Sequence, residues 1–249
     1  MTAAPKPQFD LAEAVKHLAA RDEQLKLLIA ETPPFKMDED ELQSPYEALL
    51  EAITYQSISG KAAGTIFSRI KALGSNGRAP TPEQVLKIRK PALRKAGLSG
   101  AKIQAFKDLA AKTIAGVVPS LEEAHKLSDE ELIGRLTSVR GVGAWTVEML
   151  LIFRLGRPDV LPVHDLGVQK GWAVTYGKKY MPKPKALLAF GERWRPYRTV
   201  ASWYMWRACH RAGHAALRKI RPAKTKPRKP ISKRSAAKRT GRPSSRASR

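Results

Sequence analysis

Three helix-start signals recur along this chain and constrain its fold more than any other feature. Residues 44–47 (SPYE) combine a serine that can cap a helix, a proline suited to the first turn and a glutamate that completes a capping box. Residues 81–84 (TPEQ) repeat this signal, and Ser128 with Glu131 forms a third box. Because apolar residues at helical spacing surround these signals, they predict an all-α protein.

The remaining stretches complete a body of about ten predicted helices. Apolar residues from Leu11 to Leu18 have helical spacing, and residues 99–116 form another amphipathic stretch that ends at Gly116. A last long helix is expected from Pro196 to about Leu217. Only Val160–Val163 has the pattern of extended chain. Strands therefore have little part in the predicted fold.

Positive charge gathers towards the C-terminal end. Lysine and arginine total 46 against 22 acidic residues, a net charge of +24. Residues 218–249 hold 14 of the basic residues and no acidic one, which leaves 32 basic and 22 acidic residues, or +10, for residues 1–217. We expect 1–217 to form the folded domain and 218–249 a disordered basic tail. This charge predicts a polyanionic partner, with DNA, RNA and an anionic surface as alternatives.

Neither a membrane segment nor a disulfide framework is predicted. The chain has no apolar run of the length that spans a bilayer, and its first residues lack the apolar stretch of a signal peptide. Cys209 is the single cysteine, so neither a disulfide pair nor a four-cysteine metal cluster can form within the chain. We therefore expect an intracellular, reducing location.

The most informative stretch is residues 136–147, with a capped helix before it and an apolar helix after it. Gly141 and Gly143 permit a tight turn with positive φ and let the backbone approach a ligand closely. The turn leads into a helix N-terminus, where free N–H groups can hold a phosphate. Arg140 and the Thr146 hydroxyl are candidates for further phosphate contacts. A plain helix–turn–helix connection is the alternative.

Asp165 lies 22 residues after Gly143 and is the candidate catalytic residue. It follows an extended segment and opens a helix, so an ordinary helix N-cap is the alternative. Cleavage of a nucleoside N–C1′ bond builds positive charge on the sugar. A carboxylate stabilises that charge and can orient or deprotonate the attacking water.

The hairpin pattern L-x-x-V-x-G-V-G-x-W-T, followed at this spacing by Asp165, resembles the helix-hairpin-helix/Gly-Pro-Asp DNA glycosylase superfamily. The resemblance runs over most of residues 11–215, and it is closest to the branch of 3-methyladenine DNA glycosylase II. It implies two helical subdomains with the active-site cleft between them, without the N-terminal β domain of longer relatives. It also implies a structural Na⁺ or K⁺ bound by main-chain carbonyls of Thr137, Val139 and Val142.

The resemblance also assigns a base pocket and a wedge. The pocket residues that it implies are Gln56, Trp145, Tyr204 and Trp206, although the helical spacing of Tyr204 and Trp206 also fits core packing. Smaller or non-aromatic residues stand where some relatives carry larger pocket residues: Met149, Leu166 and Gly167. The loop that holds Asn76 and Arg78 lies where relatives insert a wedge into the gap left by the flipped base.

The resemblance implies a monofunctional enzyme. Lyase members carry a Schiff-base lysine two residues after the second hairpin glycine, and this chain has Trp145 there. Cys209 alone cannot supply the iron–sulfur site of many such members. We therefore expect hydrolysis of alkylated purines in double-stranded DNA by a cofactor-free monomer in the nucleoid or the nucleus. The lesion range stays open.

Three alternatives remain. They are a non-enzymatic DNA-binding module that uses the hairpin alone, an enzyme for oxidised or mismatched bases, and a chromatin-like protein that acts through its charge.

Overall fold

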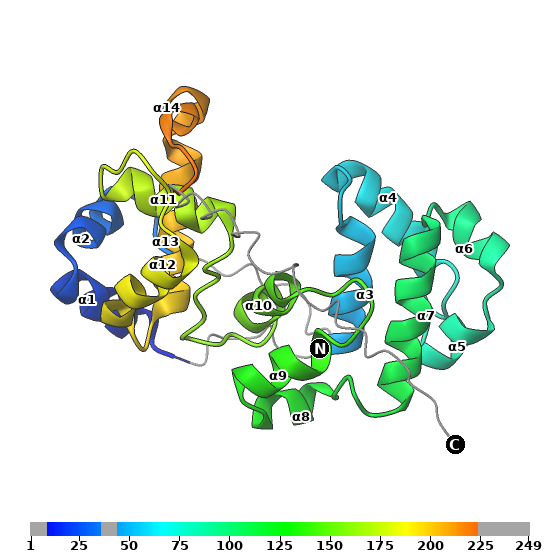
Figure 1. The fold of residues 1–249 in the computed structure, drawn as a ribbon. Coiled ribbons are helices and arrows are strands. Elements are labelled where there is room, and N and C mark those ends of the chain that lie inside the picture. Colours follow the sequence, from blue (N-terminus) through cyan, green and yellow to red (C-terminus); the bar gives the residue numbers. More distant parts are fainter. Residues whose placement is uncertain (1–8, 36–43, 224–249) are drawn as a thin grey trace, which may run out of the picture.

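The computed structural model describes residues 9–35 and 44–223, which fold into two lobes of helices (Figure 1). The first lobe contains α3 (Pro45–Tyr55), α4 (Gly60–Lys71), α5 (Pro82–Lys87), α6 (Lys90–Ala96), α7 (Gly100–Ile114), α8 (Leu121–Lys126), α9 (Asp129–Leu136) and α10 (Ala144–Phe153). The second lobe contains α1 (Leu11–Arg21), α2 (Glu23–Ala30), α11 (Leu166–Thr175), α12 (Pro184–Gly191), η1 (Glu192–Trp194), α13 (Arg198–Arg211) and α14 (Gly213–Lys219).

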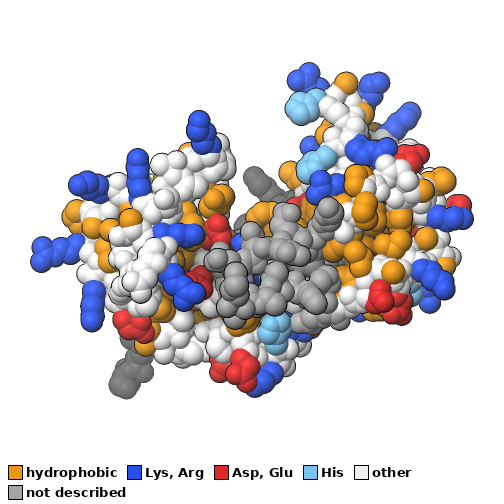
Figure 2. Space-filling model, turned by 180° about the vertical axis from the view of Figure 1, so that it is seen from behind, with side chains coloured by type: hydrophobic (Ala, Val, Ile, Leu, Met, Phe, Trp, Pro, Cys, Tyr) orange, Lys and Arg blue, Asp and Glu red, His pale blue; other side chains and the backbone are white. Residues whose placement is uncertain are grey.

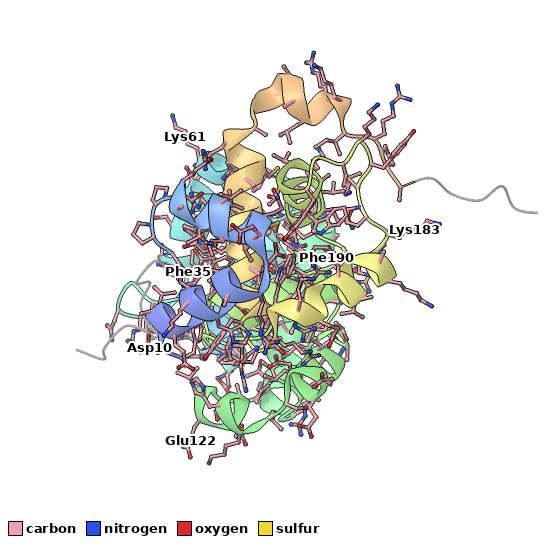
Figure 3. All side chains as sticks on the ribbon, turned by 90° about the vertical axis from the view of Figure 1, so that its left-hand side faces the viewer. Asp10, Phe35, Lys61, Glu122, Lys183 and Phe190 are labelled. Atoms are coloured by element: carbon pink, nitrogen blue, oxygen red, sulfur yellow. The ribbon has the colours of Figure 1, made fainter. Side chains whose placement is uncertain are left out.

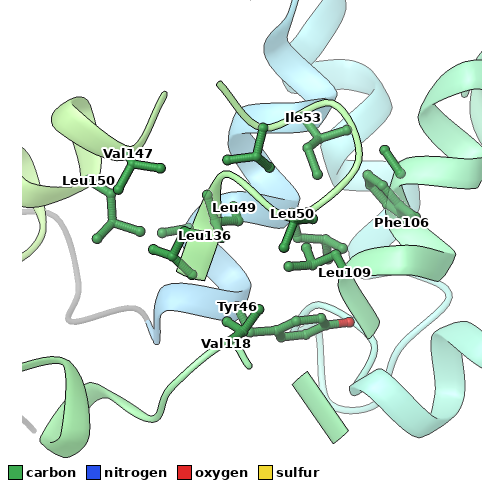
Figure 4. Packing of buried hydrophobic residues seen from close by; sticks show 14 of the residues in the cluster. Tyr46, Leu49, Leu50, Ile53, Phe106, Leu109, Val118, Leu136, Val147 and Leu150 are labelled. Carbon is green, nitrogen blue, oxygen red and sulfur yellow. The ribbon is translucent and has the colours of Figure 1, made fainter. Parts of the chain in front are cut away.

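Each lobe has its own hydrophobic core. In the first lobe, α3 and α7 bury Leu49, Leu50, Ile53, Phe106 and Leu109 against the helices on either side of the hairpin (Figure 4). Burial of a large apolar side chain stabilises the fold by about 1.5–3 kcal/mol. The first core therefore fixes α10 and the hairpin against α3.

The second core is built around α13. It buries Leu18, Trp194 and Tyr204, with α1, α2 and α12 on the outer side of the lobe (Figure 3). Gly171 of α11 lies so close to the backbone of α13 that a Cβ there would stand 1.8 Å from the carbonyl oxygen of Met205. A glycine is needed at this position because it lets the two helices touch along their backbones.

All three predicted capping boxes are present. Ser44 pairs with Glu47, Thr81 with Gln84, and Ser128 with Glu131. A fourth box, Ser120 with Glu123, opens α8. These reciprocal bonds satisfy N–H groups that a helix leaves unpaired at its start, which explains why the sequence located these helices well.

The described residues contain fourteen α-helices rather than the ten predicted. The predicted last helix from Pro196 to Leu217 is wrong in its extent, because it begins at Arg198 and is interrupted at Gly213, whose φ is +68°. Such a backbone angle cannot continue a right-handed helix, so α14 is a separate short helix. Val160–Val163 forms no strand with any of the described residues.

The predicted tail falls mostly outside the described residues. Of its residues, 218–219 end α14, and Arg221 forms an isolated bridge with Tyr180. None of the helices in the described ranges has the length and apolar character needed to cross a membrane.

Candidate active site

Asp165 is held by two indole rings that approach it from different helices. It caps α11, with its Oδ1 accepting the Val168 N–H at 2.8 Å. The same oxygen accepts Nε1 of Trp206, on α13, at 2.8 Å. The other oxygen, Oδ2, accepts Nε1 of Trp145, on α10, at 2.7 Å. The carboxylate therefore has a fixed orientation, and it joins the first lobe to the second.

Gly167 makes the bond between Trp206 and Asp165 sterically accessible. A Cβ built on Gly167 would lie 2.7 Å from Cδ1 of Trp206 and 3.0 Å from Oδ1 of Asp165. Both separations are shorter than van der Waals contact, so a larger residue would displace the indole. The sequence marked Gly167 as a position where some relatives have larger residues, and this structure uses its small size.

Residues 157–162, which precede Asp165, are fixed by α13. Arg198 binds Asp159, with Nε 2.7 Å from Oδ1, and Arg195 adds a contact of 2.8 Å to Oδ2. Thr199 bonds this segment through its N–H to the Pro158 carbonyl at 2.9 Å and through its hydroxyl to the Arg157 carbonyl at 2.6 Å. Trp206 lies two turns further along α13. The helix α13 thus holds both the segment that precedes Asp165 and, through Trp206, the Asp165 side chain.

A cavity of about 540 Å³ lies between α3 and α10, and Trp145 connects its wall to Asp165. Trp145 is half exposed and lines this cavity while it donates to Asp165. The wall also holds an ion pair between Arg154 Nη2 and Glu51 Oε2 at 3.3 Å. The apolar and aromatic lining comprises Ala48, Leu49, Ala52, Tyr55, Trp145, Met149, Leu150 and Phe153. This composition suits a flat, electron-poor ring.

The hairpin loop spans residues 137–143, and its two glycines have different roles. Gly141 takes a φ of +79°, as the tight turn predicted. Gly143 is extended at φ −98°, caps α10, and has no atom within 4 Å of an added Cβ. The open space at Gly143, rather than an unusual backbone angle, is what lets a ligand approach the N-terminus of α10.

The loop is braced from α7 and α3. Asp108 accepts the Arg140 N–H at 2.7 Å and pairs with Lys112 at 2.9 Å, and Lys112 also donates to the Ser138 carbonyl. Burial raises the pKa of Asp108, but these bonds outweigh burial and hold that pKa below its usual value. Gln56 donates from Nε2 to the Gly141 carbonyl at 2.9 Å.

Several residues that the sequence placed in the site lie elsewhere or do more than expected. Tyr204 is 1% exposed within the second core, so its assignment to the base pocket is corrected to core packing. Thr146 is buried in the cavity wall rather than presented at the surface. Gln56 lines the cavity and also braces the hairpin.

The predicted wedge residues lie in an exposed loop, and the predicted cation ligands lie in the hairpin. Asn76, with a φ of +54°, and Arg78 are exposed in the connection between α4 and α5, and neither is among the residues that line the cavity. Thr137 ends α9 and is partly exposed, whereas Val139 and Val142 are buried. The Val139 carbonyl already accepts the Val142 N–H at 3.0 Å within the turn.

Sequence reasoning missed three residues near the site. Phe153 stacks on Trp206 with ring centroids 5.8 Å apart. Ser57, at the cavity wall, has a φ of +59°, which is rare for a residue other than glycine. Burial, with a smaller contribution from Asp165, raises the pKa of Glu148 on α10 to about 7. Of these three, only Phe153 could have been found from the sequence, because it lies eight residues after Trp145 and therefore on the same face of α10.

Comparison with known proteins places this geometry among DNA repair enzymes. The family model of the HhH-GPD superfamily base excision DNA repair protein matches residues 50–196. DNA-3-methyladenine glycosylase 1 of Schizosaccharomyces pombe is 39% identical over 215 residues, or 86% of this chain and 93% of that protein.

Solved structures agree with this match. The Schizosaccharomyces pombe 3-methyladenine DNA glycosylase in complex with abasic DNA has a TM-score of 0.70 at 40% identity, over 78% of this chain and 95% of that one. A DNA-3-methyladenine glycosidase from Bacillus halodurans has a TM-score of 0.73 at 31% identity, over 88% and 98%. The all-α fold predicted from the sequence is confirmed.

Proposed function

The chain belongs to the HhH-GPD superfamily of base excision DNA repair proteins, and from this membership we propose that it hydrolyses the N-glycosidic bond of alkylated purines such as 3-methyladenine in duplex DNA. The observation that carries the proposal is the position of Asp165, which is held by two indole N–H groups, one of them from Trp145 in the wall of an aromatic cavity. The relatives' names supply the lesion class.

The two oxygens of Asp165 differ in what they can still do. Oδ1 accepts two N–H groups, from Val168 and Trp206, whereas Oδ2 accepts one, from Trp145, among the described residues. Since a carboxylate oxygen has two lone pairs, Oδ2 keeps one direction for a water molecule or the sugar. Oδ2 is therefore the atom that stabilises positive charge on the sugar and directs the attacking water.

The leaving group needs little help from the protein. A 3-methylated adenine in DNA carries a positive charge, so it departs as a neutral base without a strong general acid. The faces of Trp145 and the other rings of the cavity hold such a cation through cation–π contact, which is worth about 0.5–2 kcal/mol per ring. A normal purine is neutral and gains less from these rings, so the cavity favours damaged bases.

The proposed reaction ends with an uncut abasic site. Trp145 occupies the position two residues after Gly143 and has no amine to form a Schiff base. In the proposed complex, the open N-terminus of α10 at Gly143 binds a phosphate, with Arg140 beside it. A monovalent cation held by the carbonyls of Thr137, Val139 and Val142 would supply positive charge there. We propose that the protein acts as an intracellular monomer.

The test is release of free base from methylated duplex DNA by the wild type and by Asp165→Asn. We expect the wild type to free 3-methyladenine and to leave strands that break only after heat or alkali. For Asp165→Asn we expect a rate lower by about 10²–10⁴-fold with DNA affinity retained.

Two outcomes count against the proposal. Base release by Asp165→Asn at the wild-type rate would remove the carboxylate from the mechanism. A protein–DNA adduct trapped by borohydride would show lyase chemistry and contradict monofunctional hydrolysis.

A further inference from the structure

The C-terminal part of the second lobe, from α11 onwards, carries charge of almost one sign. Residues 166–223 contain 13 lysine and arginine residues and a single acidic residue, Glu192. Glu192 is already paired with Arg195 at 3.0 Å and lies 3.6 Å from Arg198. The helices α11, α13 and α14 therefore have no acidic side chain of their own. Figure 2 shows Lys, Arg and His side chains on the projecting part of this lobe.

A concave basic site lies between α11 and α14. Lys170 of α11 faces His214, Leu217 and Arg218 of α14 around a hollow of about 280 Å³. We call Lys170, His214 and Arg218 the α11–α14 site. Three donors around a small hollow suit a phosphate group, whose oxygens accept several hydrogen bonds at once.

The helix α14 contributes little to the core. None of its residues is buried, and it begins at Gly213, where the chain turns out of α13. A short helix gains little stability from its own hydrogen bonds. Because α14 also buries no side chain, what it adds to the protein is mainly the charge of its exposed residues, which include Arg218 and Lys219. Arg211, which precedes it, is paired with Glu31 at 3.1 Å and does not belong to the site.

The site stands close to the candidate catalytic residue. Helix α11 starts directly after Asp165, and Lys170 is five residues further on, about 7.5 Å along the helix axis. Along one strand of a duplex, phosphates recur every 3.4 Å or so of axis. The spacing along α11 is of the order of two or three such steps, so one duplex can contact both Asp165 and the site.

We propose that the α11–α14 site binds a backbone phosphate of the DNA that flanks the flipped nucleotide. The hairpin belongs to the first lobe and this site to the second, so the two hold the duplex on either side of Asp165. This inference rests on the proposed function for the identity of the polyanion. It adds a second phosphate anchor to the hairpin.

The experiment compares Lys170→Gln/Arg218→Gln with Lys183→Gln/Lys185→Gln in the full chain. Both doubles remove two positive charges from the same lobe. Lys183 and Lys185 are exposed on or beside α12, and Lys183 is labelled in Figure 3. The probe is a duplex with a stable abasic-site analogue, and its Kd is measured at several salt concentrations.

For the site variant we expect Kd to rise about tenfold near 0.1 M salt and the slope of log K against log salt to become shallower by about one, as the loss of one phosphate contact requires. The control should shift Kd less than twofold and keep the wild-type slope. Single methylphosphonate substitutions then locate the contact. One or two of them should weaken binding of the wild type and have no effect on the site variant.

Equal behaviour of the site variant and the control overturns the inference. Base release by the wild type is measured in parallel and reports on the proposed function separately. Charge-dependent binding without base release leaves the phosphate site standing and removes the glycosylase proposal. Base release by the wild type, together with equal DNA binding by the two double variants, supports the glycosylase proposal and removes the phosphate site.

Discussion

The indole Nε1 of Trp206 lies 2.8 Å from Oδ1 of Asp165 and joins two residues that are 41 positions apart. The bond connects the N-terminus of α11 to the middle of α13, the two helices that pack most closely in the second lobe. A hydrogen bond to a charged group contributes more than one between neutral groups, about 1.5–3 kcal/mol. Trp206 therefore positions the carboxylate, and its ring stacks on Phe153 of the cavity wall.

Trp206→Phe removes this donor and keeps a ring on α13. We expect the single-turnover rate of base release to fall about 10–100-fold, because a bond worth about 1.5–3 kcal/mol no longer orients Asp165. The matched control is Trp172→Phe, since the buried indole nitrogen of Trp172 has no hydrogen-bond partner in the described part of the chain. Equal rates in the two variants would show that the Trp206 N–H has no role.

Gly167→Ala tests the steric requirement for that bond. Alanine favours a helix over glycine by about 1 kcal/mol, but here its Cβ would stand 2.7 Å from Trp206. We expect slower base release, by about tenfold or more, with DNA affinity unchanged, because the displaced indole no longer fixes Asp165. Gly134→Ala in α9 meets nothing within 4 Å and should leave the rate unchanged. A fully active Gly167→Ala enzyme contradicts the steric argument.

Asp108→Ala tests the brace under the hairpin. It leaves the Arg140 N–H and the Lys112 ammonium without their acceptor, so we expect about a tenfold loss of affinity for abasic duplex. The pKa of Asp108 lies below its usual value, so the effect should be the same at pH 5 and pH 8. Asp10→Ala removes the cap of α1, which costs about 1 kcal/mol of stability, far from the hairpin. An equal loss of affinity in both variants would mean that stability alone explains the result.

Glu148 gives the protein a pH-dependent stability. Burial raises its pKa in the folded state to about 7, whereas the pKa of a glutamate in an unfolded chain is about 4.3. Between these values the folded state holds a proton that the unfolded chain releases, so Glu148 destabilises the fold increasingly as the pH rises to about 7. Above that pH, the cost stays constant.

Glu148→Gln should therefore stabilise the protein at high pH. We expect the free energy of unfolding to rise by about 1–2 kcal/mol at pH 8 and by about a third of that at pH 5, after allowance for solvent screening. Denaturant titrations at the two pH values measure the difference. Glu122→Gln, at an exposed position of α8, is the control and should change the free energy of unfolding little, because an exposed ion pair contributes little. A stabilisation of equal size at both pH values would argue against a raised pKa.

Local signals explain what could be predicted from the sequence. The capping boxes, the hairpin glycines and Asp165 depend on residues within a few positions of one another, and the structure places each of them at the predicted turn or helix start. The break at Gly213 was missed because the surrounding spacing continues to look helical.

Features that depend on contacts between distant segments could not be predicted from the sequence. Tyr204 and Trp206 both fit the spacing of a packed helix, and only the neighbours of α13 decide that Tyr204 is buried and Trp206 reaches Asp165. The need for a small residue at Gly167 depends on an indole far along the chain. The pKa of Glu148 depends on burial, which no local pattern reports.

The two separate cores have an evolutionary consequence. The cavity lies between α3 and α10 on the first core, while Asp165 is aligned by α13 on the second. Mutations that reshape the cavity wall can thus accumulate without moving the carboxylate, except at Trp145, which donates to Asp165, and at Phe153, which stacks on Trp206. A lineage with this architecture can acquire new lesion preferences through α3 and α10 while it inherits an unchanged candidate catalytic carboxylate.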